Sequence, residues 1–132
     1  MAKNEKQTKL LLFSIENIEE RKEYCLMKNN YNETTLHYTR NENKIKLLLD
    51  CFENLEERKE YCLMKNNYNY TALHLATNEK QTKLLLFSIN NLKERKEYCL
   101  IKNINYQTAL HCSYNENQTK LLLFSVNELT IA

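Results

Sequence analysis

The chain has 132 residues and a formal net charge of +2, with 27% charged and 42% hydrophobic residues. This is the length and composition of a single globular domain, and the balanced charge differs from the clustered basic face of proteins that bind nucleic acids or membrane surfaces electrostatically. No apolar run approaches the roughly 18 residues of a membrane-spanning helix. The chain has no Gly and no Pro, so Asn is the best residue left for positions with positive φ.

An internal repeat organises the whole chain. KLLL begins at residues 9, 46, 83 and 120, ERKEYC at 20, 57 and 94, and T-x-L-H at 34, 71 and 108, so each set advances by 37 residues. The N-terminal segment NEKQTKLLLFSI resembles a targeting signal, but it returns at 78–89 and we interpret it as part of the repeat. We therefore predict a single domain over 1–132, composed of partial repeat 1–33, repeats 34–70 and 71–107, and partial repeat 108–132.

Repeat 71–107 predicts three short helices followed by a turn. Thr71 is a suitable N-cap for the first helix, and we expect Asn78 to end that helix in the left-handed conformation. The second helix begins at Glu79, and its run 84–87 is apolar around more than half of the helix, so we expect the run to be buried. The sequence Asn91-x-x-Glu94 resembles a capping box for the third helix, and it recurs at Asn17 and Asn54. We expect Leu92, Cys99 and Leu100 to pack inward and 102–107 to form an extended turn.

Stacking is required because one repeat has no second layer to cover its leucines, whereas neighbouring repeats can cover them. The predicted fold class is therefore all-α, an α-solenoid with three short helices per repeat. T-A-L-H-x-A at 71–76, followed by the leucines at 84–86, resembles the ankyrin repeat, and T-x-L-H at 34–37 and 108–111 resembles it again. The repeats are longer than the usual 33 residues, and in this they are similar to ankyrin-like repeats of proteins from intracellular bacteria.

The ankyrin resemblance implies structural roles for the T-x-L-H residues, whose His braces the hairpin loop between repeats. In the family's hairpin an Asp and a Gly are common. Asn29, Asn66 and Asn103 stand at the Asp position, and Asn32, Asn69 and Tyr106 stand at the Gly position. Tyr is unfavourable in a left-handed turn, so we expect the third hairpin to be distorted. The residues to which we assign structural roles are Thr34, Thr71, Thr108, His37, His74 and His111.

A Cys and a His recur twelve residues apart, at 25/37, 62/74 and 99/111. Nucleophilic catalysis needs one oriented pair, and three equivalent copies do not build one site. Equivalent helices stack about 8–10 Å apart, too far to share a zinc ion or to form disulfides among Cys25, Cys62 and Cys99. We therefore predict no enzyme activity, no metal and no cofactor. We interpret the five cysteines as reduced thiols, and Cys51 and Cys112, which break the period, as small neutral substitutions rather than redox residues.

Variation between repeats is concentrated in the hairpin and on the exposed side of the first helix, where the resemblance implies a concave surface that binds partners. Several variable residues are Tyr, which offers a large contact area at a low entropy cost. We therefore predict a non-catalytic module that binds a partner protein. The candidate partner-binding residues are Tyr31, Glu33, Tyr38, Arg40, Asn67, Tyr68, Tyr70, Leu75, Thr77, Asn105, Gln107 and Tyr114.

Other interpretations stay open at the level of sequence. The hairpin residues could be tolerated surface positions, and the ERKEYC charges could be a docking face instead of a solvated helix surface with i,i+3 and i,i+4 pairs. Helical repeats of similar length also bind RNA one base at a time. The chain could further be a structural part of a longer repeat protein, or self-associate through uncapped ends. The expected location is the cytoplasm, and the resemblance adds delivery into a host cell as the alternative.

Overall fold

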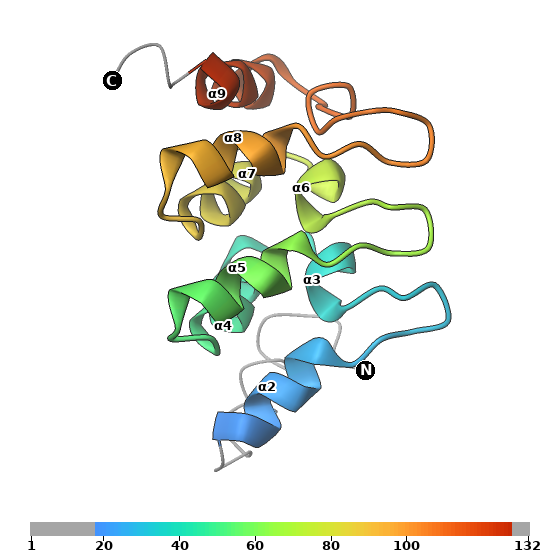
Figure 1. The fold of residues 1–132 in the computed structure, drawn as a ribbon, viewed down its shortest axis with the longest axis vertical. Coiled ribbons are helices and arrows are strands. Elements are labelled where there is room, and N and C mark those ends of the chain that lie inside the picture. Colours follow the sequence, from blue (N-terminus) through green and yellow to red (C-terminus); the bar gives the residue numbers. More distant parts are fainter. Residues whose placement is uncertain (1–17, 128–132) are drawn as a thin grey trace.

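The computed structural model describes residues 18–127 (Figure 1). Across this range the chain forms α-helices and no β-strand, which confirms the all-α prediction. The leucine run at 10–12 and the Asn17 cap lie outside the described residues. The helices are α2 (Ile18–Leu26), α3 (Thr35–Tyr38), α4 (Glu42–Asp50), α5 (Leu55–Leu63), α6 (Ala72–Leu75), α7 (Glu79–Phe87), α8 (Leu92–Cys99) and α9 (Glu116–Asn127).

The helices form layers along the long axis of the molecule (Figure 1). One unit contains α3, α4 and α5, and the next contains α6, α7 and α8 in the same order. Equivalent helices of successive units are neighbours, since α3 contacts α6, α4 contacts α7 and α7 contacts α9. The loops that precede α3 and α6, and the equivalent loop before residue 108, all protrude on the same side (Figure 1). The 37-residue period of the sequence is thus also the spatial period of the helices.

Asparagine begins most of the longer helices by accepting a hydrogen bond from a backbone N–H of the first turn. The prediction for Asn78 was wrong, because its φ of −152° is extended rather than left-handed. Its side chain accepts from the N–H of Gln81 at 2.9 Å, so it starts the second helix instead of ending the first. Five Asn residues act in this way: Asn41, Asn54, Asn78, Asn91 and Asn115.

The core lies between the stacked helices and consists mainly of leucine, tyrosine and cysteine side chains from successive units. The prediction that the whole run 84–87 is buried was wrong. Leu85 and Leu86 are fully buried, but Leu84 is half-buried and Phe87 is 54% exposed. Leu100 also faces solvent, whereas its neighbour Tyr98 is fully buried. The second helices α7 and α9 therefore bury one stripe and leave an aromatic side chain, Phe87 or Phe124, exposed to solvent, whereas α4 has Asp50 at this position.

The third hairpin keeps the conformation of the other two, so the predicted distortion at Tyr106 was wrong. Tyr106 has a φ of 62°, and Asn69 has a φ of 61°. The N–H of Tyr106 donates to the carbonyl of Asn103 at 2.9 Å, as that of Asn69 does to Asn66 at 3.0 Å. The following segment does differ, because 109–112 form a turn rather than the expected short helix.

Charged side chains of the third helices connect successive units. Lys22 pairs with Glu57 of the next unit at 3.1 Å, and Lys59 pairs with Glu94 in the same way. Arg58 donates from Nε to the carbonyl of Phe52 at 2.8 Å, which secures the start of its own helix. The ERKEYC segment therefore carries inter-unit ion pairs as well as the expected pairs along the helix. Solvent screens ion pairs at such positions, so they contribute little to stability.

The described helices are each too short or too polar to traverse a lipid bilayer.

Candidate partner-binding surface

Each hairpin is built around one asparagine side chain. In the second hairpin, Oδ1 of Asn66 accepts hydrogen bonds from the N–H groups of Tyr68 at 2.9 Å and Tyr70 at 3.0 Å. The left-handed Asn69 closes the turn. The same pattern is formed by Asn29 and by Asn103 in the other two hairpins. The loop backbone is therefore fixed by its own sequence, and the side chains on it have defined positions.

Buried histidines join the second and third hairpins to the units before them. Nδ1 of His74 accepts from the N–H of Thr71 at 3.1 Å, so the proton lies on Nε2, which donates to the carbonyl of Gln107 at 3.0 Å. Nε2 of His37 donates in the same way to the carbonyls of Met64 and Tyr70. Burial lowers the pKa of both imidazoles, so both rings are neutral at physiological pH.

These contacts separate the recurring Cys and His chemically. Both nitrogens of His74 are occupied by backbone groups, and neither contacts Cys62. Burial also raises the pKa of the Cys62 thiol to about 12, which keeps it protonated. The arrangement supports a structural role for His74 and does not form a thiolate–imidazole pair.

His111 has only one half of this arrangement. Its Nδ1 accepts from the N–H of Thr108 at 3.0 Å, as in the other repeats. The side chain is exposed, and the described residues provide no acceptor for its Nε2. The structural roles predicted for Thr34, Thr71, His37 and His74 thus have complete contacts in the structure, while those for Thr108 and His111 have part of them.

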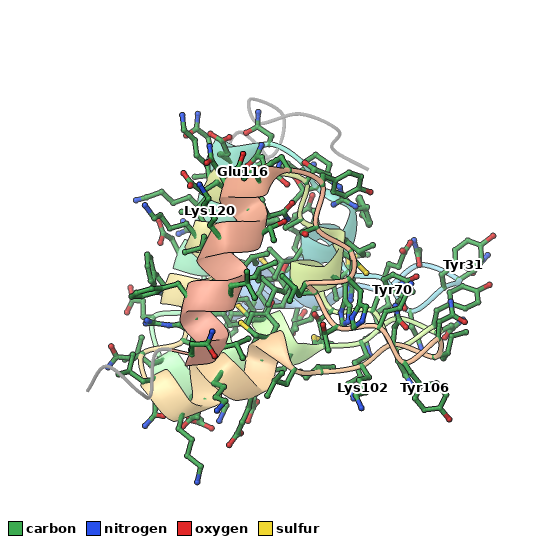
Figure 2. All side chains as sticks on the ribbon, turned by 90° about the horizontal axis from the view of Figure 1, so that it is seen from above. Tyr31, Tyr70, Lys102, Tyr106, Glu116 and Lys120 are labelled. Atoms are coloured by element: carbon green, nitrogen blue, oxygen red, sulfur yellow. The ribbon has the colours of Figure 1, made fainter. Side chains whose placement is uncertain are left out.

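Backbone hydrogen bonds link the three hairpins into a continuous row. The N–H of Asn67 donates to the carbonyl of Tyr31 at 2.9 Å, and that of Ile104 donates to the carbonyl of Tyr68 at 3.0 Å. Figure 2 shows Tyr31, Tyr70 and Tyr106 together on the side of the hairpins, away from helix α9. The hairpins therefore present their side chains from one ordered edge.

A groove of about 380 Å³ lies between the second and third hairpins. Its walls are mostly apolar, and the edge of the Tyr70 ring packs against His74 with 5.5 Å between the ring centroids. The groove joins residues from two hairpins and from helix α6, and four of its six residues were predicted from the sequence. The lining residues are Asn66, Tyr68, Tyr70, Leu75, Ile104 and Asn105.

None of the twelve predicted partner-binding residues is buried. Tyr31 is 56% exposed, Tyr68 48% and Tyr114 71%. Asn67 and Asn105 are also exposed, and Tyr38 and Leu75 are half-buried. The structure brings Tyr68, Tyr70, Leu75 and Asn105 together, and it places Tyr31 on the neighbouring hairpin.

Six of the predicted residues make internal side-chain hydrogen bonds. Arg40 donates to the carbonyls of His37 and Thr39 at 2.7 and 2.8 Å. The other five pairs are Glu33 with Asn29, Tyr38 with Thr35, Asn67 with the carbonyl of Asn30, Thr77 with Gln81 and Gln107 with Asn103. These side chains hold the loops in shape, so they have less freedom to contact a partner.

Two exposed residues of the third hairpin were missed by sequence reasoning. Ile104 is 50% exposed and lies in the groove, and Tyr106 is 79% exposed at the loop tip. The sequence did carry a signal for both, because each replaces an Asn of the earlier hairpins. Tyr106 was predicted only to distort the third hairpin and was not counted among the contact residues.

A second groove was also missed. It has a volume of about 370 Å³ and lies between α4 and α7, where Phe87 and Leu84 are flanked by Lys46, Lys80 and Lys83. Leu84 and Phe87 were expected in the core, so no groove was predicted on this face. Among the described residues, no cluster of His, Cys, Asp and Glu has an arrangement that could hold a metal ion.

No protein-family model, curated protein or solved structure matches the chain. The hairpin edge and its groove are therefore the features of the described chain that bear on function.

Proposed function

We propose that this chain is an ankyrin-like α-solenoid that serves as a non-catalytic binding module for a folded partner protein. The partner docks on the hairpin loops and on the short first helices. The observation that carries the proposal is the groove formed by Tyr68, Tyr70, Leu75 and Ile104, because it offers apolar and aromatic surface that nothing else in the described chain covers.

The rigidity of the hairpins supports the proposal. The side chains of Asn29, Asn66 and Asn103 fix each loop internally, and inter-hairpin hydrogen bonds fix the loops relative to one another. A preorganised surface loses little conformational entropy on binding, and Tyr has few rotatable bonds to restrict. The hairpin edge thus combines the two properties that favour a protein–protein contact.

The same hydrogen bonds favour a protein partner over RNA. Base readout by a helical repeat needs polar side chains that are free to pair with base edges. The amide of Asn66 is engaged with its own loop and with Glu33, and the amide of Asn103 is engaged with its loop and with Gln107. The groove beside them is predominantly apolar, which suits a hydrophobic anchor of a protein.

The absence of catalysis is part of the proposal. The His37 and His74 rings are neutral and use both nitrogens in hydrogen bonds to the backbone. Such rings hold loops in place and do not exchange protons with a substrate.

Comparative affinity purification tests the proposal. The wild-type chain, a Tyr68→Ala/Ile104→Ala variant and a Phe124→Ala control would be used as baits in parallel. Phe124 is 53% exposed on α9, so the control removes a similar aromatic area outside the hairpin row. We expect a partner that binds the wild type and the control with equal affinity and the groove variant about 30-fold more weakly, the loss typical of a hot spot.

Equal binding of every recovered protein to all three baits would contradict the proposed site. Recovery that disappears after RNase treatment would replace the protein partner with RNA.

A further inference from the structure

Two thiols from different repeat units lie close together inside the molecule. Cys25 lies at the end of α2 and Cys51 caps the end of α4, and both residues meet at the carbonyl of Leu48, which accepts from Sγ of Cys25 at 4.0 Å and from the N–H of Cys51 at 3.2 Å. The two thiols are near enough to shift each other's pKa. Cys25 is fully buried, and Cys51 is 8% exposed. The Sγ of Cys51 also donates to the carbonyl of Leu47 at 3.4 Å. The pair is therefore held in place by the ends of two helices.

The other repeat units show that this contact belongs to the fold. The residues that correspond to Cys25 and Cys51 are Cys62 and Ser88, and Ser88 is close enough to Cys62 to lower the pKa of its thiol through a side-chain hydrogen bond. The Oγ of Ser88 donates to the carbonyl of Leu84 at 2.8 Å, just as Cys51 donates to Leu47. Two successive junctions between units thus bring these positions together, and the first of them has sulfur at both.

We propose that Cys25 and Cys51 form a site of reversible disulfide formation, with a peroxide as the oxidant. The thiolate of Cys51 attacks a peroxide oxygen, so that hydroxide leaves and a sulfenic acid forms on Cys51. The sulfur of Cys25 then attacks that sulfenic sulfur, the S–S bond forms and water leaves. In total, two thiols and one hydrogen peroxide give one disulfide and two waters.

The environment assigns different roles to the two sulfurs. The hydrogen bond from Cys25 lowers the pKa of Cys51, and Arg21 acts in the same direction. The corresponding bond and burial raise the pKa of Cys25. Cys51 is thus the better nucleophile and the more accessible thiol, while Cys25 is the resolving residue beside it. Because only a small area of Cys51 is exposed, a small oxidant reaches this thiol more easily than a bulky disulfide reagent does.

The bond would enclose the first hairpin and helix α3 within a closed loop. This loop includes Tyr31 and Tyr38, so oxidation would restrict the part of the chain that carries the first of the hairpin residues. By the loop-closure relation, a bridge over such a segment raises the Tm of a domain of this size by roughly 10 °C. The proposal stands on the thiol contact and does not depend on a partner.

Intact-mass spectrometry of the full chain tests the proposal. The protein is treated with hydrogen peroxide, denatured in excess alkylating reagent and weighed, before and after reduction. We expect the wild type to lose two hydrogens and to accept three alkyl groups instead of the five accepted after reduction. The Cys51→Ser variant has four cysteines and should accept four alkyl groups throughout, and its fold is preserved because Ser occupies this position in the next two units.

The repeat supplies a gain-of-function control. Ser88→Cys places a second thiol against Cys62, so we expect this variant to form two disulfides. Cleavage after Glu distinguishes the bridges, because it links 24–33 to 43–53 in the first case and 61–79 to 80–94 in the second. Trypsin would not show whether Cys25 or Cys62 takes part in a given bridge, since EYCLMK occurs at both 23–28 and 60–65.

Three outcomes would overturn the proposal. The wild type could retain five thiols under peroxide, gain oxygen on Cys51 without an S–S bond, or form disulfides only between molecules. A Tm that does not rise in the oxidised wild type relative to the Cys51→Ser variant would contradict the predicted loop closure.

Discussion

The same four residues, T-A-L-H, adopt different structures at 71–74 and 108–111. In both places the backbone N–H of Thr donates to Nδ1 of His, at 3.1 and 3.0 Å. The first copy forms the buried helix α6, and Nε2 of His74 reaches the next hairpin at Gln107. The second copy forms a turn, and His111 is exposed.

The difference shows that the local sequence fixes the cap but not the helix. A helix of one turn is unstable by itself, because nucleation restricts several residues for a single hydrogen bond. α6 is covered by α3, α5 and α7. The short first helix is thus a product of packing between units, and substitutions at paired positions can measure how much of the stability this packing provides.

The largest contrast is expected for the leucines of the two copies. Leu73 is 1% exposed, and Leu110 is half-buried. Leu73→Ala should lower the free energy of unfolding by about 2–5 kcal/mol, the usual cost of a core truncation. Leu110→Ala should cost less than half of that. Urea unfolding monitored by circular dichroism measures both, and equal losses would show that the two copies are packed alike.

The histidines should give a smaller contrast. His74→Ala leaves the buried N–H of Thr71 without its acceptor and removes one of the two donors to the Gln107 carbonyl, which keeps the N–H of Asn103, so we expect a loss of about 1–3 kcal/mol. His111→Ala should cost under about 1 kcal/mol, because only its Nδ1 contact is present in the described chain. Thermal unfolding of both variants beside the wild type provides the measurement. A larger loss for His111→Ala would contradict the bracing role.

Acid should destabilise the protein through the same histidines. Burial lowers the pKa of His37 and His74 below the value of about 6.5 for an unfolded chain. Their contribution is therefore complete above about pH 6.5 and decreases as the pH falls through the folded-state pKa, because the unfolded chain binds protons first. Urea midpoints between about pH 7.5 and pH 5 test this. A midpoint that does not fall over this range would contradict the role of the two buried imidazoles.

The smallest effect is expected at Tyr106, which has a φ of 62°. Tyr106→Asn restores the residue of the other two hairpins, so we expect a gain of up to about 1 kcal/mol from relief of the left-handed backbone. Differential scanning calorimetry measures the rise in Tm. An unchanged or lower Tm would mean that contacts of the Tyr side chain offset its backbone strain.

The sequence allowed the all-α class, the positions of the hairpins and most helix starts to be predicted, because the repeat showed which residues are equivalent. It did not show how wide a stripe each second helix buries. Phe87 and Leu86 are adjacent and equally apolar, and their different exposure is decided by where the neighbouring helices lie. Asn78 was misassigned because Asn satisfies both a left-handed C-cap and an extended N-cap.

The candidate site was also predictable only in part, because the exposure of a side chain depends on where the neighbouring elements lie. Variation between repeats identified Tyr68, Tyr70 and Leu75, which share one groove. It did not distinguish side chains that face a partner from side chains such as Arg40, which is engaged with its own backbone. The contact between Cys25 and Cys51 was invisible without the structure, because a Cys at the serine position has meaning only when its neighbour is known.

The hydrogen bonds between hairpins have a consequence for how such a gene can change. The N–H of Asn67 donates to the carbonyl of Tyr31, and the N–H of Ile104 donates in the same way to the carbonyl of Tyr68. The second hairpin therefore carries one donor for the hairpin before it and one acceptor for the hairpin after it. Segments 18–32 and 55–69 differ at a single residue, and unequal recombination between such stretches adds or deletes a whole layer. Every layer gained in this way arrives with its bonding partners already in phase. The number of repeats can thus change without breaking these hydrogen bonds, whereas a change in the number of residues per repeat would break them.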